Sequence, residues 1–291
     1  MVYAEIPYTA AVREAVGAAF GVPDEPAVRL QGGEESAAYR VADLVIRLGP
    51  SWRTDAEMAW FAGLAAHASA AVPEVIAPLQ ARSGDYVIRA AQRPVTVWPF
   101  AAGTWPGKYD AGVRQQAAEL LVRVHAALAD APGPVEPVTA MPQGPGEDLA
   151  DPWLDAWLAE RAQGKVQPLH GDFYRGNTLA VGGRITALLD WDDAVVGPVE
   201  REAAEGAWEW GGCLDTGVVD GAQEFLAAYA AAGGPIVDDL TFRQYARARM
   251  RGEILLARTR WNELDADDHS YHERQVAAYH ALTSKPTPGG R

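Results

Sequence analysis

Cysteine, lysine and long apolar runs are scarce in this sequence. The scarcity of cysteine and the scarcity of long apolar runs each exclude a class of protein. The one cysteine, Cys213, excludes an internal disulfide and suits a reducing compartment, and we expect it to be a small buried apolar residue. No apolar run approaches the roughly 20 residues that span a bilayer, and the N-terminus lacks the charged-then-apolar pattern of a secretory signal. We therefore expect a cytoplasmic protein with no membrane partner.

Positive charge is also in short supply. The 291 residues include 25 lysines and arginines against 39 aspartates and glutamates, which gives a net charge of −14. This balance argues against a nucleic-acid partner, because such binding depends on neutralising phosphates, and it favours a cationic small molecule. The hydrophobic content of 48% with 22% charged residues is that of a folded globular protein, long enough for two lobes.

The periodicity of the sequence changes near residue 100. Before that point we expect strands over 27–30, 37–41, 44–48, 86–89 and 95–98, and helices over 10–20 and 55–68. The second helix starts with a capping box formed by Thr54 and Glu57. After Gly103 helical spacing prevails, interrupted by a proline-rich loop over 131–147. Further helices are expected over 113–128, from 151 onward, and over 200–211, 216–232, 238–262 and 270–283.

Two short segments carry the chemistry. A His-Gly-Asp triplet at 170–172 is followed by Asn177, and Asp190 ends an apolar run. Taken singly, these residues would be ordinary turn, cap or buried residues. Together they supply what phosphoryl transfer from ATP requires: a carboxylate that accepts a hydroxyl proton, and two oxygen ligands that hold magnesium against the phosphates. Asn177 and Asp190 end the two strands of an expected hairpin, which would bring them close together.

The pattern His-Gly-Asp, with asparagine five residues after the aspartate and a Leu-Asp-Trp downstream, resembles the aminoglycoside phosphotransferase family, also called choline-kinase-like. The resemblance implies an α+β, bilobal, protein-kinase-like fold. A small antiparallel N-terminal lobe would cover residues 1–100 and end in a hinge, and a mostly helical C-terminal lobe would cover 101–291. ATP and Mg²⁺ are the implied cofactors, and the implied acceptor is a hydroxyl group of a small molecule.

The resemblance also implies roles for the motif residues. Asp172 orients and deprotonates the acceptor hydroxyl, and Asn177 and Asp190 hold magnesium. His170 supports the loop by hydrogen bonds. Arg175, which homoserine kinase-like members also carry, steadies the loop or touches the transferring phosphoryl group.

On the nucleotide side, the resemblance places a phosphate-covering loop at Gly32 and Gly33, although adjacent glycines between strands are often only a turn. Arg47 stands where protein kinases carry a lysine, and arginine can bind phosphates bidentately. We expect Glu57 to be its partner, with Asp55 as a competitor.

The hinge would bind adenine through the backbone around Trp98 and Phe100. This aromatic pair could equally pack between the lobes.

The acceptor pocket is expected next to the metal acid. Its candidate residues, close in sequence, are Asp192, Glu202, Glu205, Trp208 and Glu209. The three glutamates fall on one helix face, which could hold an ammonium group or simply be solvated. A second acidic set is either another wall of this pocket or a solvent-exposed loop, and it consists of Glu263, Asp265, Asp267 and Asp268. A series of arginines is expected to form a charged helix face that balances these acids, and it consists of Arg243, Arg247, Arg249 and Arg251.

The sequence thus predicts an ATP-dependent kinase of a small, amine-bearing molecule, as a monomer or homodimer. Homoserine, amino alcohols such as choline, and aminoglycosides remain alternatives as acceptors. A protein kinase is disfavoured because Gly197-Pro198 leads almost directly from the metal acid into a helix, without an activation segment. A non-catalytic nucleotide-binding pseudokinase is the other alternative.

Overall fold

The computed structural model describes residues 5–32, 36–107 and 109–283. In this part of the chain, five N-terminal strands form one antiparallel sheet in the order β1-β2-β3-β5-β4. The strands are β1 (Val28–Arg29), β2 (Ala37–Val41), β3 (Leu44–Leu48), β4 (Ile88–Ala90) and β5 (Arg93–Pro99). Ala91 and Gln92, both with positive φ, form a tight turn between the last two. The strand expected over 86–89 is therefore shifted toward this turn.

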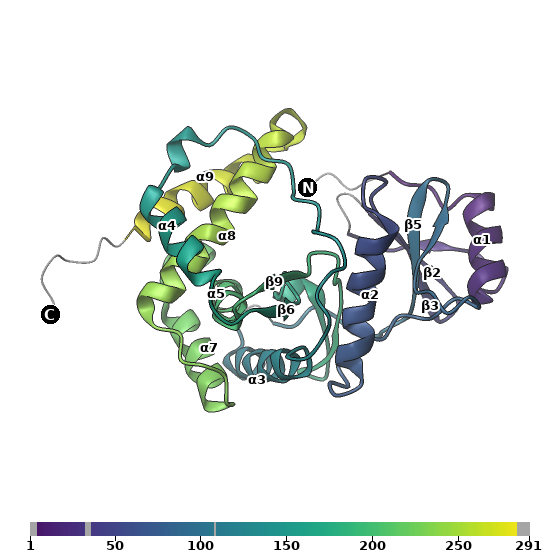
Figure 1. Ribbon diagram of the computed structural model, residues 1–291, viewed down its shortest axis with the longest axis horizontal. Helices are drawn as coiled ribbons and strands as arrows, with labels where there is room; N and C mark the ends of the chain where they lie inside the picture. Colours follow the sequence, from purple (N-terminus) through teal and green to yellow (C-terminus); the bar gives the residue numbers. More distant parts are fainter. Residues whose placement is uncertain (1–4, 33–35, 108, 284–291) are drawn as a thin grey trace, which may run out of the picture.

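Two helices accompany this sheet, and they are α1 (Ala10–Phe20) and α2 (Asp55–Ser69). Figure 1 shows them on opposite sides of the strands, with α2 between the sheet and the C-terminal helices. Val12 of α1 shares a hydrophobic core with the sheet residues Ile46 and Val97. Phe61 of α2 belongs instead to the large core of the C-terminal region. The expected capping box at Thr54 is present.

The C-terminal region is mainly helical, as expected. Its α-helices are α3 (Ala111–Ala127), α4 (Pro152–Arg161), α5 (Val199–Trp210), α6 (Cys213–Thr216), α7 (Asp220–Ala231), α8 (Asp239–Thr259) and α9 (Ala266–Ala281), and its 3₁₀-helices are η1 (Glu147–Leu149), η2 (Arg175–Asn177) and η3 (Trp261–Glu263). The last α-helix begins four residues earlier than expected because Asp265 and Asp268, assigned above to the second acidic set, form its capping box. Residues 131–146 form the expected loop.

Two small antiparallel strand pairs position residues 170–177, the loop that the sequence predicts to be catalytic. The expected hairpin is β7 (Thr178–Val181) with β8 (Arg184–Leu188), and β6 (Gln167–Leu169) pairs with β9 (Val195–Gly197). The second pair was not expected from the sequence, because three-residue strands are too short to show a period. Residues 170–177 follow β6 and lead into β7, so both pairs fix the ends of the loop.

Helix α5 lies inside the C-terminal region, and it is surrounded by α3, α7 and α8. Most of its residues, including Glu202 and Glu205, are buried. Cys213 is buried as expected, and burial raises the pKa of its thiol to about 12. Among the described residues, no helix is long and apolar enough to cross a membrane.

Candidate active site

The catalytic loop is fixed by His170, which is fully buried. Its Nε2 lies 2.9 Å from the carbonyl oxygen of Leu189, and its Nδ1 lies 3.3 Å from the backbone nitrogen of Asp172. One tautomer satisfies both contacts: Nε2–H donates to the carbonyl, and Nδ1 accepts from the N–H. These contacts tie the loop to the end of the β7–β8 hairpin and place His170 as a support.

Gly171 explains why the triplet carries glycine. Its φ is +86°, and a Cβ atom at this position would lie 1.9 Å from the carbonyl oxygen of Asp193. Any side chain would therefore collide with backbone that cannot move independently. The loop is packed directly against the segment that follows Asp190.

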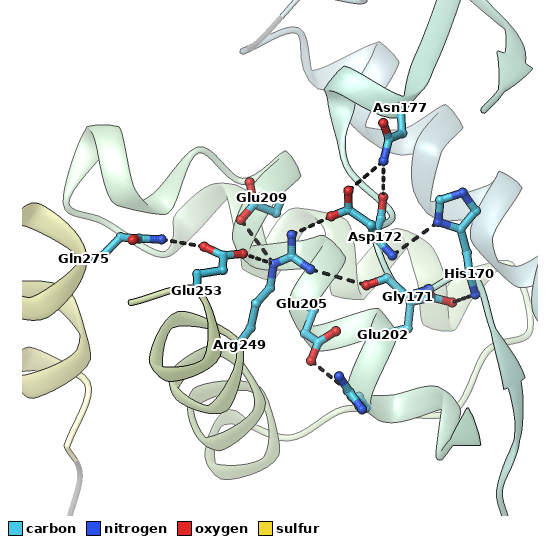
Figure 2. A network of polar contacts seen from close by, with 11 residues as sticks. His170, Gly171, Asp172, Asn177, Glu202, Glu205, Glu209, Arg249, Glu253 and Gln275 are labelled. Carbon is cyan, nitrogen blue, oxygen red and sulfur yellow. Dashed lines mark hydrogen bonds and ion pairs between the residues drawn. The ribbon is translucent and has the colours of Figure 1, made fainter. Parts of the chain in front are cut away.

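Asp172 and Asn177 lie in direct contact (Figure 2). The side-chain amide of Asn177 donates to Oδ2 of Asp172 at 2.7 Å and to its carbonyl oxygen at 3.0 Å. The other carboxylate oxygen, Oδ1, accepts from Nη2 of Arg249 at 2.7 Å. The carboxylate is thus held at both oxygens.

Asp190 lies at the far end of the expected hairpin and adopts a positive φ of 59°. Such a backbone is uncommon for a residue with a side chain, although aspartate adopts it more readily than most, and it clusters at turns and functional sites. The N–H of Leu189 donates to the carbonyl of Asn177 at 2.8 Å, so the hairpin ends meet as expected.

Arg47 of β3 reaches across to this point. Its Nη1 donates to Oδ1 of Asp190 and its Nη2 donates to Oδ2 of Asp192, both at 2.9 Å. The expected pairing with Glu57 is wrong, and so is the alternative pairing with Asp55, which bonds Arg89. Glu57 is committed to the start of its own helix, because its carboxylate accepts from the N–H of Thr54 and cannot also reach β3.

Replacing Glu57 with glutamine should therefore destabilise the fold. The carboxylate is buried and also accepts from the N–H of Thr139, which anchors the 131–146 loop. Burial opposes ionisation, but the hydrogen bonds from Thr139 and Thr54 lower the pKa of Glu57 to about 2. A folded-state pKa below the unfolded value of about 4.3 gives stability that is present above that pH and is lost as the pH falls toward 2.

We expect E57Q to reduce the free energy of unfolding by about 1–3 kcal/mol at pH 7, and the difference from wild type to shrink in acid. Urea unfolding of both proteins at neutral and acidic pH measures this. Equal midpoints at pH 7 would contradict the anchoring role.

A magnesium site is compatible with the oxygen donors at the hairpin ends. Asn177 offers an amide oxygen and Asp190 a carboxylate, which are the hard ligands that Mg²⁺ prefers. Among the described residues, no group of three or more His, Cys, Asp or Glu side chains converges on a metal position. Phosphate oxygens and water would therefore have to complete the coordination, as is usual for this ion.

The nucleotide side is only partly described. Gly32 has a positive φ of 104°, a conformation in which glycine is favoured, whereas Gly33 lies outside the described residues. Trp98 donates its indole N–H to the Thr96 hydroxyl at 2.8 Å. The ring of Phe100 lies beneath a guanidinium, 3.8 Å from the Arg40 Cζ.

The backbone N–H of Phe100 donates to the carbonyl of Asp43 at 2.8 Å. The β2–β3 turn therefore uses this N–H, and adenine contact from the rest of the backbone around Trp98 and Phe100 stays a prediction.

Two of the expected acceptor residues have other roles. Glu202 is 1% exposed, and it accepts from the backbone N–H groups of His170 and Gly171 while contacting Nε2 of His125 at 2.8 Å. Burial opposes its charge, but the His125 contact holds the pKa of Glu202 below its ordinary value. Trp208 is packed in the core against Phe242. Both corrections have the same cause, since α5 is an interior helix and not a surface one.

Glu205 and Glu209 differ in their surroundings. Figure 2 shows Glu205 directed away from Asp172; its Oε1 accepts from Nε of Arg201 at 2.9 Å. Glu205 lines a cavity of about 520 Å³ between α4, β9, α5 and α8. Glu209 lies on the Asp172 side, with Oε1 3.6 Å from Nε of Arg249.

Two residues of this site could not be recognised from their local sequence pattern. Arg249 and Glu253 of α8 form an ion pair at 2.8 Å beside Asp172, whereas the arginines of this helix were expected on the surface. Their spacing alone does not reveal which face of α8 meets the catalytic loop. Arg175 lies on the other side of the loop, with Nη1 3.4 Å from the carbonyl oxygen of Pro106, a contact that steadies the loop.

The electrostatics of the site reflect many acids held close together. Burial, with Asp172, Asp190 and Asp192 nearby, raises the pKa of Asp193 to about 7. Burial, with Glu253 and Asp172 nearby, also raises the pKa of Glu209 to about 7 although Arg249 opposes this. Both carboxyl groups are therefore partly protonated near neutral pH, and an added cation nearby would favour their ionised forms.

Comparison with known proteins adds two findings. The model of the phosphotransferase enzyme family (APH) matches residues 26–252. No curated protein sequence matches the chain significantly.

Solved structures share this architecture. The amicoumacin kinase hAmiN, in complex with AMP-PNP, Ca²⁺ and Ami, has a TM-score of 0.70 at 15% identity, with 94% of this chain and 93% of that one covered. A microcompartment-associated aminopropanol kinase has a TM-score of 0.67 at 16% identity, with coverages of 93% and 95%. A choline/ethanolamine kinase family protein from Mesorhizobium loti has a TM-score of 0.61 at 19% identity, with coverages of 95% and 96%. At these identities the likeness concerns the fold, and it confirms the expected bilobal, protein-kinase-like α+β architecture.

Proposed function

This chain belongs to the phosphotransferase enzyme family and is a small-molecule kinase, and from that premise we propose that it transfers the γ-phosphate of MgATP to a hydroxyl group of a small, amine-bearing molecule. The proposal depends above all on the contact between Asp172 and Asn177, together with the backbone bond that brings Asn177 to the strand end before Asp190. We infer that a proton acceptor and two oxygen ligands for a metal lie at this end of the hairpin.

The roles follow from the chemistry of each group. Asp172 accepts the proton of the acceptor hydroxyl as its oxygen attacks the γ-phosphorus; the bond from that phosphorus to the β,γ-bridging oxygen breaks, and ADP leaves with the electron pair. Asn177 and Asp190 would hold Mg²⁺. The bound metal would neutralise charge on the phosphate oxygens. The transition state of such transfers is loose, so the carboxylate must be well placed more than strongly basic. We further propose that the lobes meet after residue 100, just beyond the end of β5.

An amine on the acceptor is supported by the acidic side chains gathered beside Asp172. Glu209 and Glu253 lie next to this carboxylate, and a protonated amine there would relieve their repulsion. Kinases of similar fold act, by their names, on amicoumacin and aminopropanol. The cavity at Glu205 is the alternative location for the amine.

Thermal shift with ATP, with and without Mg²⁺, tests the nucleotide part of the proposal. Phosphate transfer to matched amine and des-amino acceptors, including ethanolamine, 1-amino-2-propanol and homoserine, then tests the acceptor. Stabilisation by MgATP with no turnover on any acceptor would favour the pseudokinase. Equal rates on the matched pairs would contradict amine recognition but leave the kinase assignment intact.

Arg47 should matter for ATP and much less for the acceptor. We propose that its guanidinium binds the triphosphate, so Arg47→Ala should raise the KM for ATP by about tenfold or more, while Arg47→Lys should be partly tolerated because lysine keeps the charge but loses the fork. Initial-rate kinetics with both substrates varied measure this. If both variants match the wild type, Arg47 serves only its ion pairs with Asp190 and Asp192.

A further inference from the structure

Arg249 connects the C-terminal helices to the carboxylate of Asp172. It lies on α8, 77 residues further along the chain, and its Nη2 donates to Oδ1 of Asp172 at 2.7 Å. Asn177 binds the other oxygen, Oδ2, at the same distance. The carboxylate is therefore gripped by one donor from its own loop and one from a distant helix, which fixes its plane.

Arg249 is itself held in place. Its Nε lies 2.8 Å from Glu253, one turn later on α8, and 3.6 Å from Glu209 of α5. Glu253 in turn accepts from the side-chain amide of Gln275 on α9 (Figure 2). The Arg249 side chain is only 16% exposed, so solvent screens these contacts weakly. A guanidinium fixed in this way can act as a rigid support.

The cation at this point also offsets repulsion. Asp172 has Glu209 and Glu253 beside it, and the loop is packed against the segment that carries Asp193. Without Arg249, neighbouring acids would push the Asp172 carboxylate out of position. Misplacement of a reacting group by about 1 Å can cost roughly a hundredfold in rate.

We propose that Arg249 is a positioning residue for phosphoryl transfer: it orients Asp172 from the helical side so that a remaining lone pair faces the acceptor hydroxyl. This inference rests on the function proposed above. Arg249 acts through Asp172 and does not touch the reacting atoms. The neighbouring arginines of α8 have separate partners, Arg247 with Asp151 and Arg251 with Asp155, so the role belongs to one position of the helix.

Arg249→Gln and Arg249→Lys test the proposal, with Arg243→Gln as the matched control. Arg243 lies on the same helix and pairs with Asp239 on the surface. We expect R249Q to lower kcat by about 10- to 100-fold with the KM for ATP unchanged within about twofold, and R249K to recover part of the loss. R243Q should match the wild type. Glu253→Gln, which keeps the guanidinium but removes its support, should give a smaller loss of kcat and serves if R249Q does not fold.

The decisive comparison is the effect of R249Q in a D172N background. If Arg249 works through Asp172, the second substitution should change the residual rate by less than about twofold. An equal loss of rate from R249Q in both backgrounds would overturn the inference about Arg249. Wild-type kcat in both R249Q and E253Q would overturn it too. In either case, phosphate transfer by the wild-type protein would leave the proposed function intact. Wild type that transfers phosphate neither to the acceptor panel nor to water would overturn both, and would point to the pseudokinase.

Discussion

Asp172→Asn is expected to lower the turnover rate by about a hundredfold or more, while nucleotide affinity stays close to that of the wild type. Asparagine keeps the shape of the side chain and can still accept from Arg249, but it cannot take the proton of the acceptor hydroxyl. The oxygen donors of Asn177 and Asp190, proposed above as metal ligands, are left in place. The variant therefore separates the chemical step from binding.

Steady-state rates and calorimetric titration of MgATP measure the two effects. Asp155→Asn is a suitable control, because this acid pairs with Arg251 on the surface, away from the catalytic loop. A D172N variant with a wild-type rate would remove Asp172 from the mechanism. A variant that lost nucleotide binding as well would mean that the Asp172–Asn177 contact organises the metal site.

The catalytic hairpin could be predicted because local signals agree there. Two glycines at 182–183 mark the turn, apolar residues mark both strands, and Asn177 and Asp190 lie at the strand ends. The supporting role of His170 was implied by the family resemblance, and its contacts with the backbone of Leu189 and Asp172 agree with that role. In such a segment the residues that contact each other in the structure are also close together in the sequence.

The predicted pairing of Arg47 with Glu57 was wrong because the same carboxylate was also expected to form the capping box. The capping box at Thr54 was predicted correctly, and it already uses Glu57. The pairing with Arg47 was expected by analogy with protein kinases, and it is incompatible with that local hydrogen bond. Arg47 is instead drawn to Asp190 and Asp192, which are more than 140 residues away in sequence.

Burial of α5 and the role of Arg249 required the tertiary structure. The glutamates of α5 look like a solvated face, yet Glu202 is buried because the backbone N–H groups of the catalytic loop need an acceptor there. Arg249 is one of several arginines on α8, and only the docking of this helix against the loop distinguishes it from Arg243. Long-range packing of this kind leaves no local pattern.

Asp190→Ala should remove the magnesium dependence of nucleotide binding. A hard cation such as Mg²⁺ needs the carboxylate oxygen. Loss of a residue that only hydrogen-bonds a metal ligand lowers metal affinity by about 10- to 100-fold, so loss of the ligand itself should lower it at least as much. The same change releases Nη1 of Arg47, which Asp190 holds at 2.9 Å. We therefore expect metal-free ATP to bind D190A as well as it binds the wild type, or better.

Calorimetric titration of a non-hydrolysable ATP analogue, with and without Mg²⁺, distinguishes these contributions, and Asp192→Ala is the matched variant because Asp192 holds the other nitrogen of the same guanidinium. If Asp190 is the ligand, magnesium should strengthen binding to D192A but not to D190A. The reverse result would make Asp192 the ligand and Asp190 the anchor of Arg47. Strengthening by magnesium in both variants would mean that neither carboxylate is required by itself, and would contradict the assignment of Asp190 as the necessary ligand.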